Sequence, residues 1–397
     1  MEQTSATAKE LSRQLRHSIN RFLDGSSRTG FFKSKGKSFR VGKKRQHPII
    51  SPTIVELCAE LGMDSGLSSL GDLEETDSLC VFLQSIEEPL GKILLRDPSN
   101  HQSIHIEKDF RGDDFIGTRF EKLPEIFKPF HEPETSGLDI YLHGSMADLK
   151  FTAFSDVDDL IVLTREAWAH PTRLRRSLAL LKTAARGFQD LDPYQHHGHW
   201  LITEFDLLAY DESIMPTVVL DHAKRIVGRD RLPINIISNR NGFIGHAENT
   251  IKSMRRTMAG ITLKGGLNAF QLKGLVGEIA IMPAYLFQAG GEKITKPEAI
   301  GRSGELFSIA AMAALRWATF VRDHYVSLVE NPRTRALQTY VNLFCKHRSQ
   351  AEAIFRKYSV YVNKEHRLGV NDQACSAIDA FIRETCEHIS KVQSECS

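Results

Sequence analysis

Two short segments of the chain carry residue types and spacings that could do chemistry. The first is a Gly-Ser pair at 144–145, directly after an apolar run, and the second is an Asp-Val-Asp sequence at 156–158, at the start of another apolar run. Residues two positions apart in a strand point to the same face, so the carboxylates of Asp156 and Asp158 are expected to converge. Converging carboxylates repel each other unless a cation compensates. Oxygen ligands of this kind favour a hard dication such as Mg²⁺.

The Gly-Ser turn has a complementary property. Gly144 and Ser145 are expected to join a strand to a helix, where a phosphate can approach the backbone and accept N–H hydrogen bonds. The Ser145 hydroxyl can donate one more. A phosphate cradle beside paired carboxylates is the combination that phosphoryl or nucleotidyl transfer requires. Asp156 and Asp158 could also cap a helix or line a solvated turn, but the apolar residues after them favour the start of a buried strand.

Apolar spacing indicates the elements that position these residues. It predicts strands at 138–143 and 156–164, a helix from Pro171 to about Gly187, and a third strand at 200–210. Later residues form long apolar stripes at helical spacing. The predicted fold class is α+β, with a small mixed sheet flanked by helices. Four parts are expected: a basic, flexible arm at 1–48, an extension at 49–116 whose fold the pattern does not indicate, a catalytic domain at 117–240 and an all-α helical domain at 241–397. Within the arm, residues 8–23 have the pattern of an amphipathic helix, and the Gly, Ser and Lys-rich remainder is expected to be poorly ordered.

The segment that contains both motifs resembles the signature of the DNA polymerase beta-like nucleotidyltransferase superfamily. That signature is Gly-Ser or Gly-Gly after an apolar residue and, after a spacer, Asp-x-Asp between apolar positions. The resemblance covers roughly residues 117–215, with a weaker similarity in the helices after 246. It implies that Asp156 and Asp158 bind two metal ions and that a nucleotidyl group passes from a nucleoside triphosphate to a hydroxyl, with release of pyrophosphate.

The resemblance also implies a third carboxylate on a later strand. Asp206, between two apolar residues, fits best, and Glu204 is the alternative. The alternative to a catalytic role is that Asp206 is an exposed charge on an edge strand. The third carboxylate would bind one metal ion and accept the proton of the attacking hydroxyl. The expected catalytic and metal-binding residues are therefore Asp156, Asp158 and Asp206, with Mg²⁺ as the cofactor and Mn²⁺ as a substitute.

A triphosphate needs positive charge around it. The expected nucleotide-binding residues are Gly144 and Ser145 together with Lys264 and Lys273, which are placed like the basic residues that the family directs into its cleft. Single lysines on helices are more often solvated. Further candidates on the same helices are Lys252, Arg255 and Arg256.

Three histidines, His196, His197 and His199, lie just before the third expected strand. Imidazole is a common ligand of transition metals, but neither a Cys nor a His-Glu-x-x-His pattern accompanies these residues. Two interpretations stay open: a turn beside the third carboxylate that contacts the acceptor or the nucleotide, and a purely structural turn.

Positive charge is concentrated near the N-terminus. Residues 1–50 contain twelve Lys and Arg against three acidic residues, although the net charge of the whole chain is +2. Basic side chains interleaved with phenylalanines could follow the phosphates of RNA or another polyanion through residues 9–45. The alternative is a solubilising or partner-binding tail.

Composition limits the remaining function classes. With 397 residues, 41% hydrophobic and 25% charged, the chain can bury one large core or several ordinary ones, which excludes disorder throughout. No apolar run reaches the roughly 18 residues of a membrane span. The six cysteines form no C-x-x-C pair and favour a reducing compartment. We therefore expect no membrane partner and a cytoplasmic location.

The first functional hypothesis is a Mg²⁺-dependent nucleotidyltransferase whose acceptor is an RNA end, a protein hydroxyl or a small molecule. The second is a catalytically silent regulatory subunit of the same fold that binds nucleotide or nucleic acid. A third hypothesis keeps the fold and changes the chemistry to a nucleotide-cyclising or oligomerising enzyme.

Overall fold

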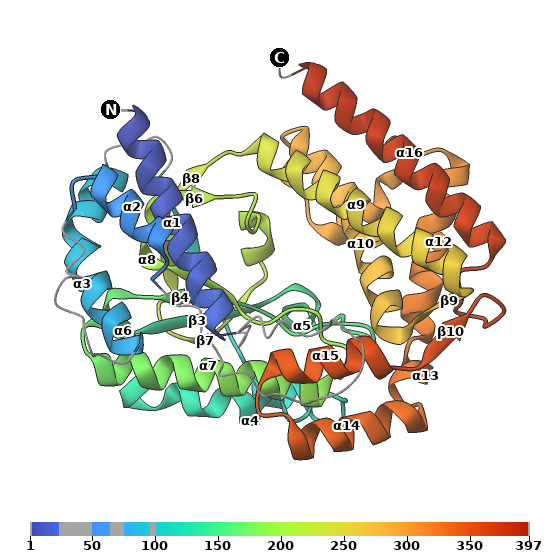
Figure 1. Ribbon diagram of the computed structural model, residues 1–397, viewed down its shortest axis with the longest axis horizontal. Coiled ribbons are helices and arrows are strands. Elements are labelled where there is room, and N and C mark those ends of the chain that lie inside the picture. The colour runs from blue at the N-terminus through green and yellow to red at the C-terminus, as the bar shows by residue number, and fades with distance from the viewer. Residues whose placement is uncertain (1, 24–49, 64–74, 96–100, 136, 396–397) are drawn as a thin grey trace, which may run out of the picture.

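The computed structural model of the chain is a mixed α+β structure with three small sheets and many helices (Figure 1). It describes residues 2–23, 50–63, 75–95, 101–135 and 137–395. The α+β class, the small mixed sheet and the helical C-terminal region that the sequence predicts are thus confirmed. In the described ranges, no helix combines the length and the apolar character that crossing a membrane requires.

The central sheet has five strands in the order β2-β7-β3-β4-β5. Their bounds are Lys108–Asp109 for β2, Lys224–Val227 for β7, Leu138–His143 for β3, Asp158–Leu163 for β4 and Trp200–Thr203 for β5. β3 is antiparallel to β4, with His143 opposite Asp158. β5 is parallel to β4, with Leu163 opposite Thr203. The end of β3 and the start of β4 therefore share one edge of the sheet, and β5 ends at the opposite edge.

β4 separates two hydrophobic cores. Ile161 and Leu163 belong to the larger core, whereas Leu160 and Val162 belong to a second core on the other face. Successive side chains of a strand alternate between faces. Asp158 is consequently on the face of Leu160, and the next residue, Asp159, points to the opposite side.

The helices that contribute to the larger core include α1 (Glu2–Leu23), α2 (Pro52–Glu60), α3 (Glu75–Leu94) and α7 (Pro171–Leu191). In α1 the four residues Ala8, Leu11, Leu15 and Ile19 recur at helical spacing, and all are fully buried. The amphipathic helix expected near Ala8–Leu23 is thus present in α1, and its apolar face packs against the core, so this part of the expected arm is not flexible. Residues 24–48 of the expected arm lie outside the described residues.

The third expected strand differs from the structure. The range 200–210 contains β5, a short helix α8 (Glu204–Leu208) and the start of β6 (Tyr210–Asp211). Thr203 and Asp206 form a capping box, in which Oδ2 of Asp206 accepts hydrogen bonds from the backbone N–H of Thr203 at 2.8 Å and from its hydroxyl at 2.9 Å. This local bonding starts a helix where the apolar composition favours a strand.

The remaining strands form two smaller sheets. β1 (His101–His105), β8 (Arg231–Ile237) and β6 make a three-stranded sheet, and β9 (Gly266–Asn268) pairs with β10 (Tyr361–Asn363). The short helices in the N-terminal half include α4 (Leu123–Phe127), α5 (Gly144–Ala147) and α6 (Arg165–Trp168).

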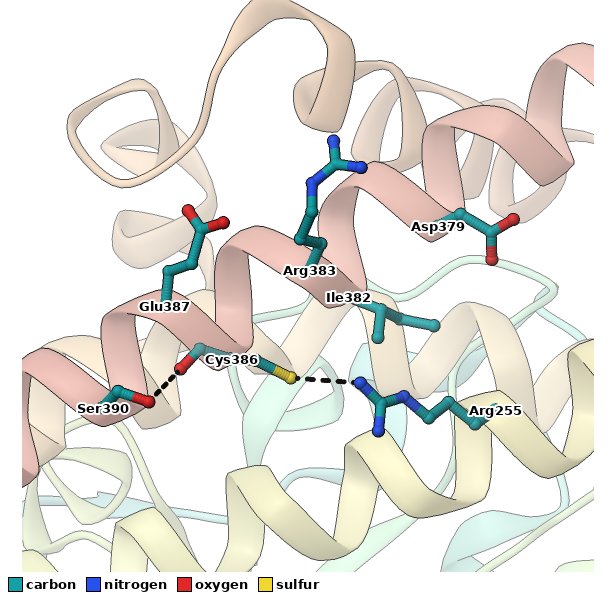
Figure 2. Close-up of a pocket in the computed structure, with 7 residues that line it drawn as sticks. All are labelled: Arg255, Asp379, Ile382, Arg383, Cys386, Glu387 and Ser390. Atoms are coloured by element: carbon teal, nitrogen blue, oxygen red, sulfur yellow. Dashed lines mark hydrogen bonds between the residues drawn. The ribbon is translucent and has the colours of Figure 1, made fainter.

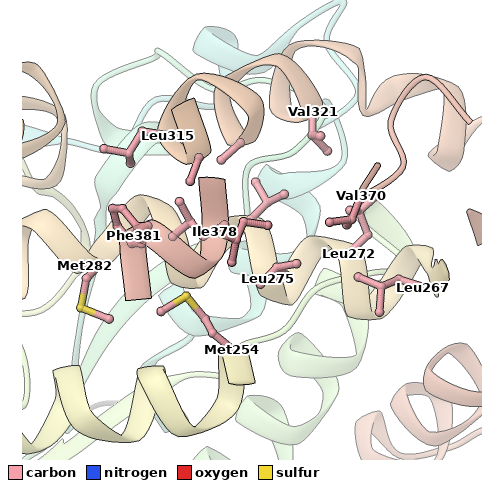
Figure 3. Close-up of a cluster of buried hydrophobic side chains, with 14 of the residues drawn as sticks. Met254, Leu267, Leu272, Leu275, Met282, Leu315, Val321, Val370, Ile378 and Phe381 are labelled. Atoms are coloured by element: carbon pink, nitrogen blue, oxygen red, sulfur yellow. The ribbon is translucent and has the colours of Figure 1, made fainter. Parts of the chain in front are cut away.

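Helices follow from residue 240 onward. They are α9 (Arg240–Lys264), α10 (Ala269–Ala289), α11 (Lys296–Gly301), α12 (Ile309–His324), α13 (Val326–Val329), α14 (Pro332–Phe344), α15 (Arg348–Tyr358) and α16 (Asp372–Glu395). Figure 3 shows their core, in which Met254, Leu275, Ile378 and Phe381 meet from α9, α10 and α16. α15 contacts α7, which joins this region to the α/β part (Figure 1).

Glu278 is a buried carboxyl on α10, and its Oε2 has no hydrogen-bond partner among the described residues. Burial raises the pKa of this carboxyl, against the opposing effects of the Ser253 hydrogen bond and the charge of Arg256. A raised pKa stabilises the fold only while the carboxyl is protonated, so that contribution is lost as the pH rises through the folded-state pKa. Glu278→Gln is therefore expected to increase the free energy of unfolding by about 1 kcal/mol at pH 7.

The gain from Glu278→Gln should shrink toward pH 4, where the native carboxyl is also protonated. Urea unfolding at both pH values measures it, with the exposed Glu121→Gln as the matched control. Equal or lower stability at pH 7 would contradict the expectation.

Candidate functional site

The turn after β3 lies directly beside a carboxylate of β4. Gly144 has a φ of 65°, a left-handed conformation that glycine adopts without strain. A Cβ at this position would lie 3.4 Å from Oδ2 of Asp158. Ser145 follows in the one-turn helix α5, half-buried. The structure thus brings together Gly144, Ser145 and Asp158, three of the residues that the sequence indicates.

Asp156 lies just before β4, and its partner comes from the helical region. The Nζ atom of Lys273 on α10 is 2.5 Å from Oδ1 of Asp156 and 2.5 Å from Oδ2 of Asp192. The Lys273 side chain is 1% exposed, and that of Asp192 is fully buried. Lys273, which the sequence assigns to the nucleotide, is therefore an ion-pair partner of the candidate metal ligand itself.

The ionisation of this pair follows from its surroundings. Burial favours the neutral form of Asp156, but Lys273, His197 and His196 outweigh it and lower the pKa of the carboxyl to about 2. Burial also disfavours the charged form of Lys273, yet Asp156 and Asp192 raise its pKa. Both groups are therefore charged at neutral pH.

Asp192 and Gln195 fix the segment around Asp156. Oδ1 of Asp192 accepts a hydrogen bond from the backbone N–H of Tyr194 at 3.0 Å and lies 3.6 Å from Nη2 of Arg119. The Gln195 side chain accepts from the N–H of Val157 at 3.0 Å and donates to its carbonyl oxygen at 2.9 Å. This amide bonds as a neighbouring strand would, so the chain before β4 stays extended.

Two further cations lie near the carboxylates. Lys296 on α11 is half-buried. Burial and the charge of Arg322 lower its pKa, while Asp158 and Asp156 act in the opposite direction. Arg322 on α12 lies over the ring of Phe154, 5.5 Å from its centroid, and the ammonium of Lys273 is 5.4 Å from the same centroid. The helical region therefore supplies Lys273 and Lys296 to the carboxylates and places Arg322 beside Phe154.

The three histidines have different surroundings. His196 packs against Phe270, with ring centroids 4.4 Å apart, and its Nε2 is 3.1 Å from the Phe270 carbonyl oxygen. Burial lowers the pKa of His196 to about 4, so its ring is neutral. His197 is exposed. Because Leu160 is opposite Trp200, the segment before β5 is level with the start of β4, and His197 acts electrostatically on Asp156.

His199 has a structural role. Its Nδ1 is 2.6 Å from Oδ2 of Asp159, and its Nε2 is 2.8 Å from the carbonyl oxygen of Leu181 on α7. Both ring nitrogens of His199 are therefore engaged, one by Asp159 and the other by the Leu181 carbonyl oxygen. The pair joins β4 to α7 on the face away from Asp158. The histidines are therefore not one metal-binding group.

Asp206, the expected third carboxylate, is at the wrong edge of the sheet. It follows the end of β5, whereas Asp158 starts β4. At about 3.3 Å per residue, the length of β4 places the two edges roughly 16 Å apart. Its Oδ1 accepts from Ser12 at 3.0 Å and from Arg16 at 2.5 Å, both on α1. Asp206 is 3% exposed, so it is neither an edge-strand surface charge nor a neighbour of the other two carboxylates.

The alternative, Glu204, is also elsewhere. Its carboxylate accepts from the backbone N–H of Arg165 and pairs with Arg229. Glu204, like Asp206, follows β5 and is at the edge opposite to Asp158. The prediction of a third carboxylate from this segment is therefore wrong, because the chain turns into α8 after Thr203.

We expect Asp206→Asn to destabilise the fold without removing the candidate site. The amide cannot pair with the mostly buried Arg16, and breaking a buried ion pair costs about 3 kcal/mol. Urea unfolding measures the loss, and Glu204→Gln on the same helix is the control, expected below about 1 kcal/mol because its pairs are partly exposed. A loss of triphosphate binding by Asp206→Asn that exceeds its unfolded fraction would contradict this assignment.

Lys264, the other predicted lysine, is not brought to Asp156. It ends α9 with an exposed side chain, and its carbonyl oxygen accepts a hydrogen bond from Tyr361. Arg255 lies in a groove of about 650 Å³ between α9 and α16, where its guanidinium donates to Sγ of Cys386 (Figure 2). None of the site residues named above lines this groove. Lys252 and Arg256 also lie on α9, and within the part of the chain that the structure describes neither forms an ion pair with Asp156 or Asp158.

The donor set limits what metal the site can hold. In the part of the chain that the structure describes, no three His, Cys, Asp or Glu side chains are grouped as metal ligands. Asp156 and Asp158 alone provide hard oxygen donors, which suit one Mg²⁺ completed by water and substrate oxygens. A second ion lacks its usual third carboxylate, and Oδ1 of Asp156 is already bound to Lys273.

Sequence reasoning missed Asp192, Gln195, Lys296 and Arg322. The first two lie in a polar segment that is typical of a turn, and their importance depends on contacts with residues 38 and 81 positions away. Lys296 and Arg322 resemble ordinary helical surface residues. Only the packing of the helical region against β4 distinguishes them.

No protein-family model matches the chain, and neither a curated protein nor a solved structure shows significant similarity to it. The resemblance to nucleotidyltransferases therefore depends on the motif residues and their geometry.

Proposed function

We propose that the protein binds a nucleoside triphosphate as its Mg²⁺ complex and transfers the nucleotidyl group to a hydroxyl acceptor, releasing pyrophosphate. The observation that carries this proposal is the close approach of the Gly144 turn to Asp158. A Cβ added at Gly144 would lie 3.4 Å from Oδ2 of Asp158. A phosphate at the backbone of Gly144 and a cation on Asp158 would be close enough to share a triphosphate.

Each part of the site has a function in this proposal. Asp158 would hold the divalent cation, which when bound stabilises the negative charge on the transferred phosphate, and Asp156, bound to Lys273, would add negative charge beside it. The Ser145 hydroxyl would donate to a phosphate oxygen. Lys296 and Arg322 would offset the charge of the remaining phosphates, since the electrostatic effect of Asp156 and Asp158 already reaches Lys296.

The acceptor is proposed in the order RNA end, protein hydroxyl and small molecule. The preference for RNA depends on the basic segment 24–48, outside the described residues, because residues 9–23 belong to the packed helix α1. The expected compartment is the cytoplasm, since the five cysteines that the structure describes are free thiols.

A silent nucleotide-binding subunit is the second candidate. It is favoured by one observation: Asp206, the carboxylate expected to accept the proton, is bound to α1 rather than placed beside Asp156 and Asp158. Such a protein would bind a triphosphate and divalent cation without transferring the nucleotide.

The experiment incubates the full chain with labelled ATP, CTP, GTP or UTP and Mg²⁺ or Mn²⁺, with and without total RNA or lysate. Label is followed in protein, RNA and small-molecule fractions, pyrophosphate is measured, and mass spectrometry detects cyclic or oligomeric products. Asp158→Ala tests the site, and the exposed Asp221→Ala is the control.

The outcomes separate the candidates. Transfer that Asp158→Ala abolishes supports the proposed enzyme. Cation-dependent binding without any transfer or pyrophosphate supports the silent subunit. Cyclic products without an acceptor would replace nucleotidyl transfer by cyclisation, and no binding of any triphosphate would reject the proposal. If RNA is labelled, neutralising the basic residues between 28 and 45 should lower that labelling and leave triphosphate binding intact.

A further inference from the structure

Lys273 combines burial, charge and position in an unusual way. Its ammonium is 2.5 Å from one oxygen each of Asp156 and Asp192, and its side chain is 1% exposed. The lysine comes from α10, 117 residues after Asp156 in the chain. Short, charge-assisted contacts to two carboxylates are strong, and they require a cation at this point between the strand and the helix.

The positive charge of Lys273 is balanced by the neighbouring carboxylates. Asp192 is fully buried and also lies near Arg119, so Lys273 and Arg119 together balance Asp156 and Asp192. Asp158 is the remaining acid of the site, and it faces the Gly144 turn. Among the described residues Asp156 and Asp192 are held in ion pairs and Asp158 is not, so Asp158 is the acid of this site that remains open to an added cation.

A second divalent ion would meet two obstacles. It would need a further carboxylate, but Asp206 is bound to Ser12 and Arg16 at the other edge of the sheet. An ion on Asp156 would also lie beside the buried ammonium of Lys273, and like charges in a poorly solvated place repel strongly. The arrangement thus disagrees with the pair of metal ions that the family resemblance implies.

We infer that the Lys273 ammonium takes the place of a second divalent cation, so that the site binds a triphosphate with a single divalent cation, held at Asp158. This inference rests on the proposed function for the triphosphate, but the position of the built-in cation does not depend on it. Lys273 is a positioning residue: it fixes Asp156 and couples α10 to the start of β4.

The first test counts cations. The full-length protein is saturated with a non-hydrolysable nucleoside triphosphate analogue, and bound Mn²⁺ is measured by equilibrium dialysis with electron paramagnetic resonance. We expect binding to saturate at one Mn²⁺ per chain. Saturation at two per chain would overturn the inference even if nucleotidyl transfer is demonstrated.

The second test needs no nucleotide. Lys273→Met leaves Asp156 and Asp192 without their shared cation, so the variant should unfold at a lower temperature than the wild type. Millimolar Mn²⁺ should raise its unfolding temperature by several degrees, more than twice the shift in the wild type. Lys264→Met, a change of the same type at an exposed position, should behave like the wild type.

Equal Mn²⁺ shifts in Lys273→Met and the wild type would overturn the inference. Lys273→Arg keeps the charge and should retain the weak Mn²⁺ response of the wild type. If Lys273→Met does not fold, the cation count decides. If no triphosphate binds the wild type, the proposed function fails, whereas the nucleotide-free comparison still decides whether Lys273 acts as the built-in cation.

Discussion

Asp158→Ala is expected to lower nucleotidyl transfer by at least about 10²–10³-fold, the scale of losing one electrostatic stabiliser of a transition state. Asp158 is the carboxylate beside Gly144, and it forms no ion pair with any other described residue, in contrast to Asp156 with Lys273. Removal of this carboxylate takes away the site where a cation and a phosphate at the turn would meet. Pyrophosphate release per folded molecule is the measurement.

Asp158→Asn refines this expectation. The amide keeps the shape and half-buried position but loses the charge, so activity should fall nearly as far while the unfolding temperature stays close to that of the wild type. Asp221→Ala, a change of an exposed acid outside the central strands, should retain full activity. Transfer by Asp158→Ala at the wild-type rate would remove the candidate site from the reaction.

The second large effect concerns stability. His199→Ala is expected to lower the free energy of unfolding by about 3–5 kcal/mol, because it leaves a buried charge without its partner. Asp159 is fully buried, and its Oδ2 is 2.6 Å from Nδ1 of His199. The same substitution also removes the donor to the Leu181 carbonyl oxygen on α7. Urea unfolding measures the change.

A double-mutant cycle isolates the pair. Asp159→Asn combined with His199→Ala should cost less than the sum of the two single substitutions, because the buried charge is then gone. Additive effects would mean that the two side chains are not coupled. Triphosphate binding per folded molecule should stay unchanged in the double variant, since this pair is on the face of β4 away from Asp158.

Apolar spacing was sufficient to predict the elements that carry the motif. β3 has its expected bounds, β4 begins two residues later than expected, and α7 begins at Pro171 as predicted. These elements could be predicted because each has a local apolar pattern in the sequence. A buried strand needs a continuous apolar run, and a helix on a core needs an apolar stripe. The opposite orientation of Asp159 relative to Asp158 follows from the same alternation.

The range 200–210 shows where composition misleads. Its residues have the apolar and β-branched character of a strand, and only the Thr203 to Asp206 capping box indicates a helix start. Both signals are local, and the competition between them is decided by tertiary contacts: Asp206 is stabilised by Arg16, 190 residues earlier in the chain. The assignment of Asp206 to catalysis depended on the wrong element.

Sequence spacing was sufficient to predict that Gly144 and Ser145 lie beside Asp158. The turn follows β3, and the next strand, β4, pairs back against β3 with its start beside that turn. The environment of Asp156 required the folded molecule. Lys273, Asp192 and Arg119 belong to three distant segments, and their charges interact only when α10 packs against the start of β4. Local periodicity specifies which face a side chain occupies, but the partner it meets there depends on how separate helices and strands pack.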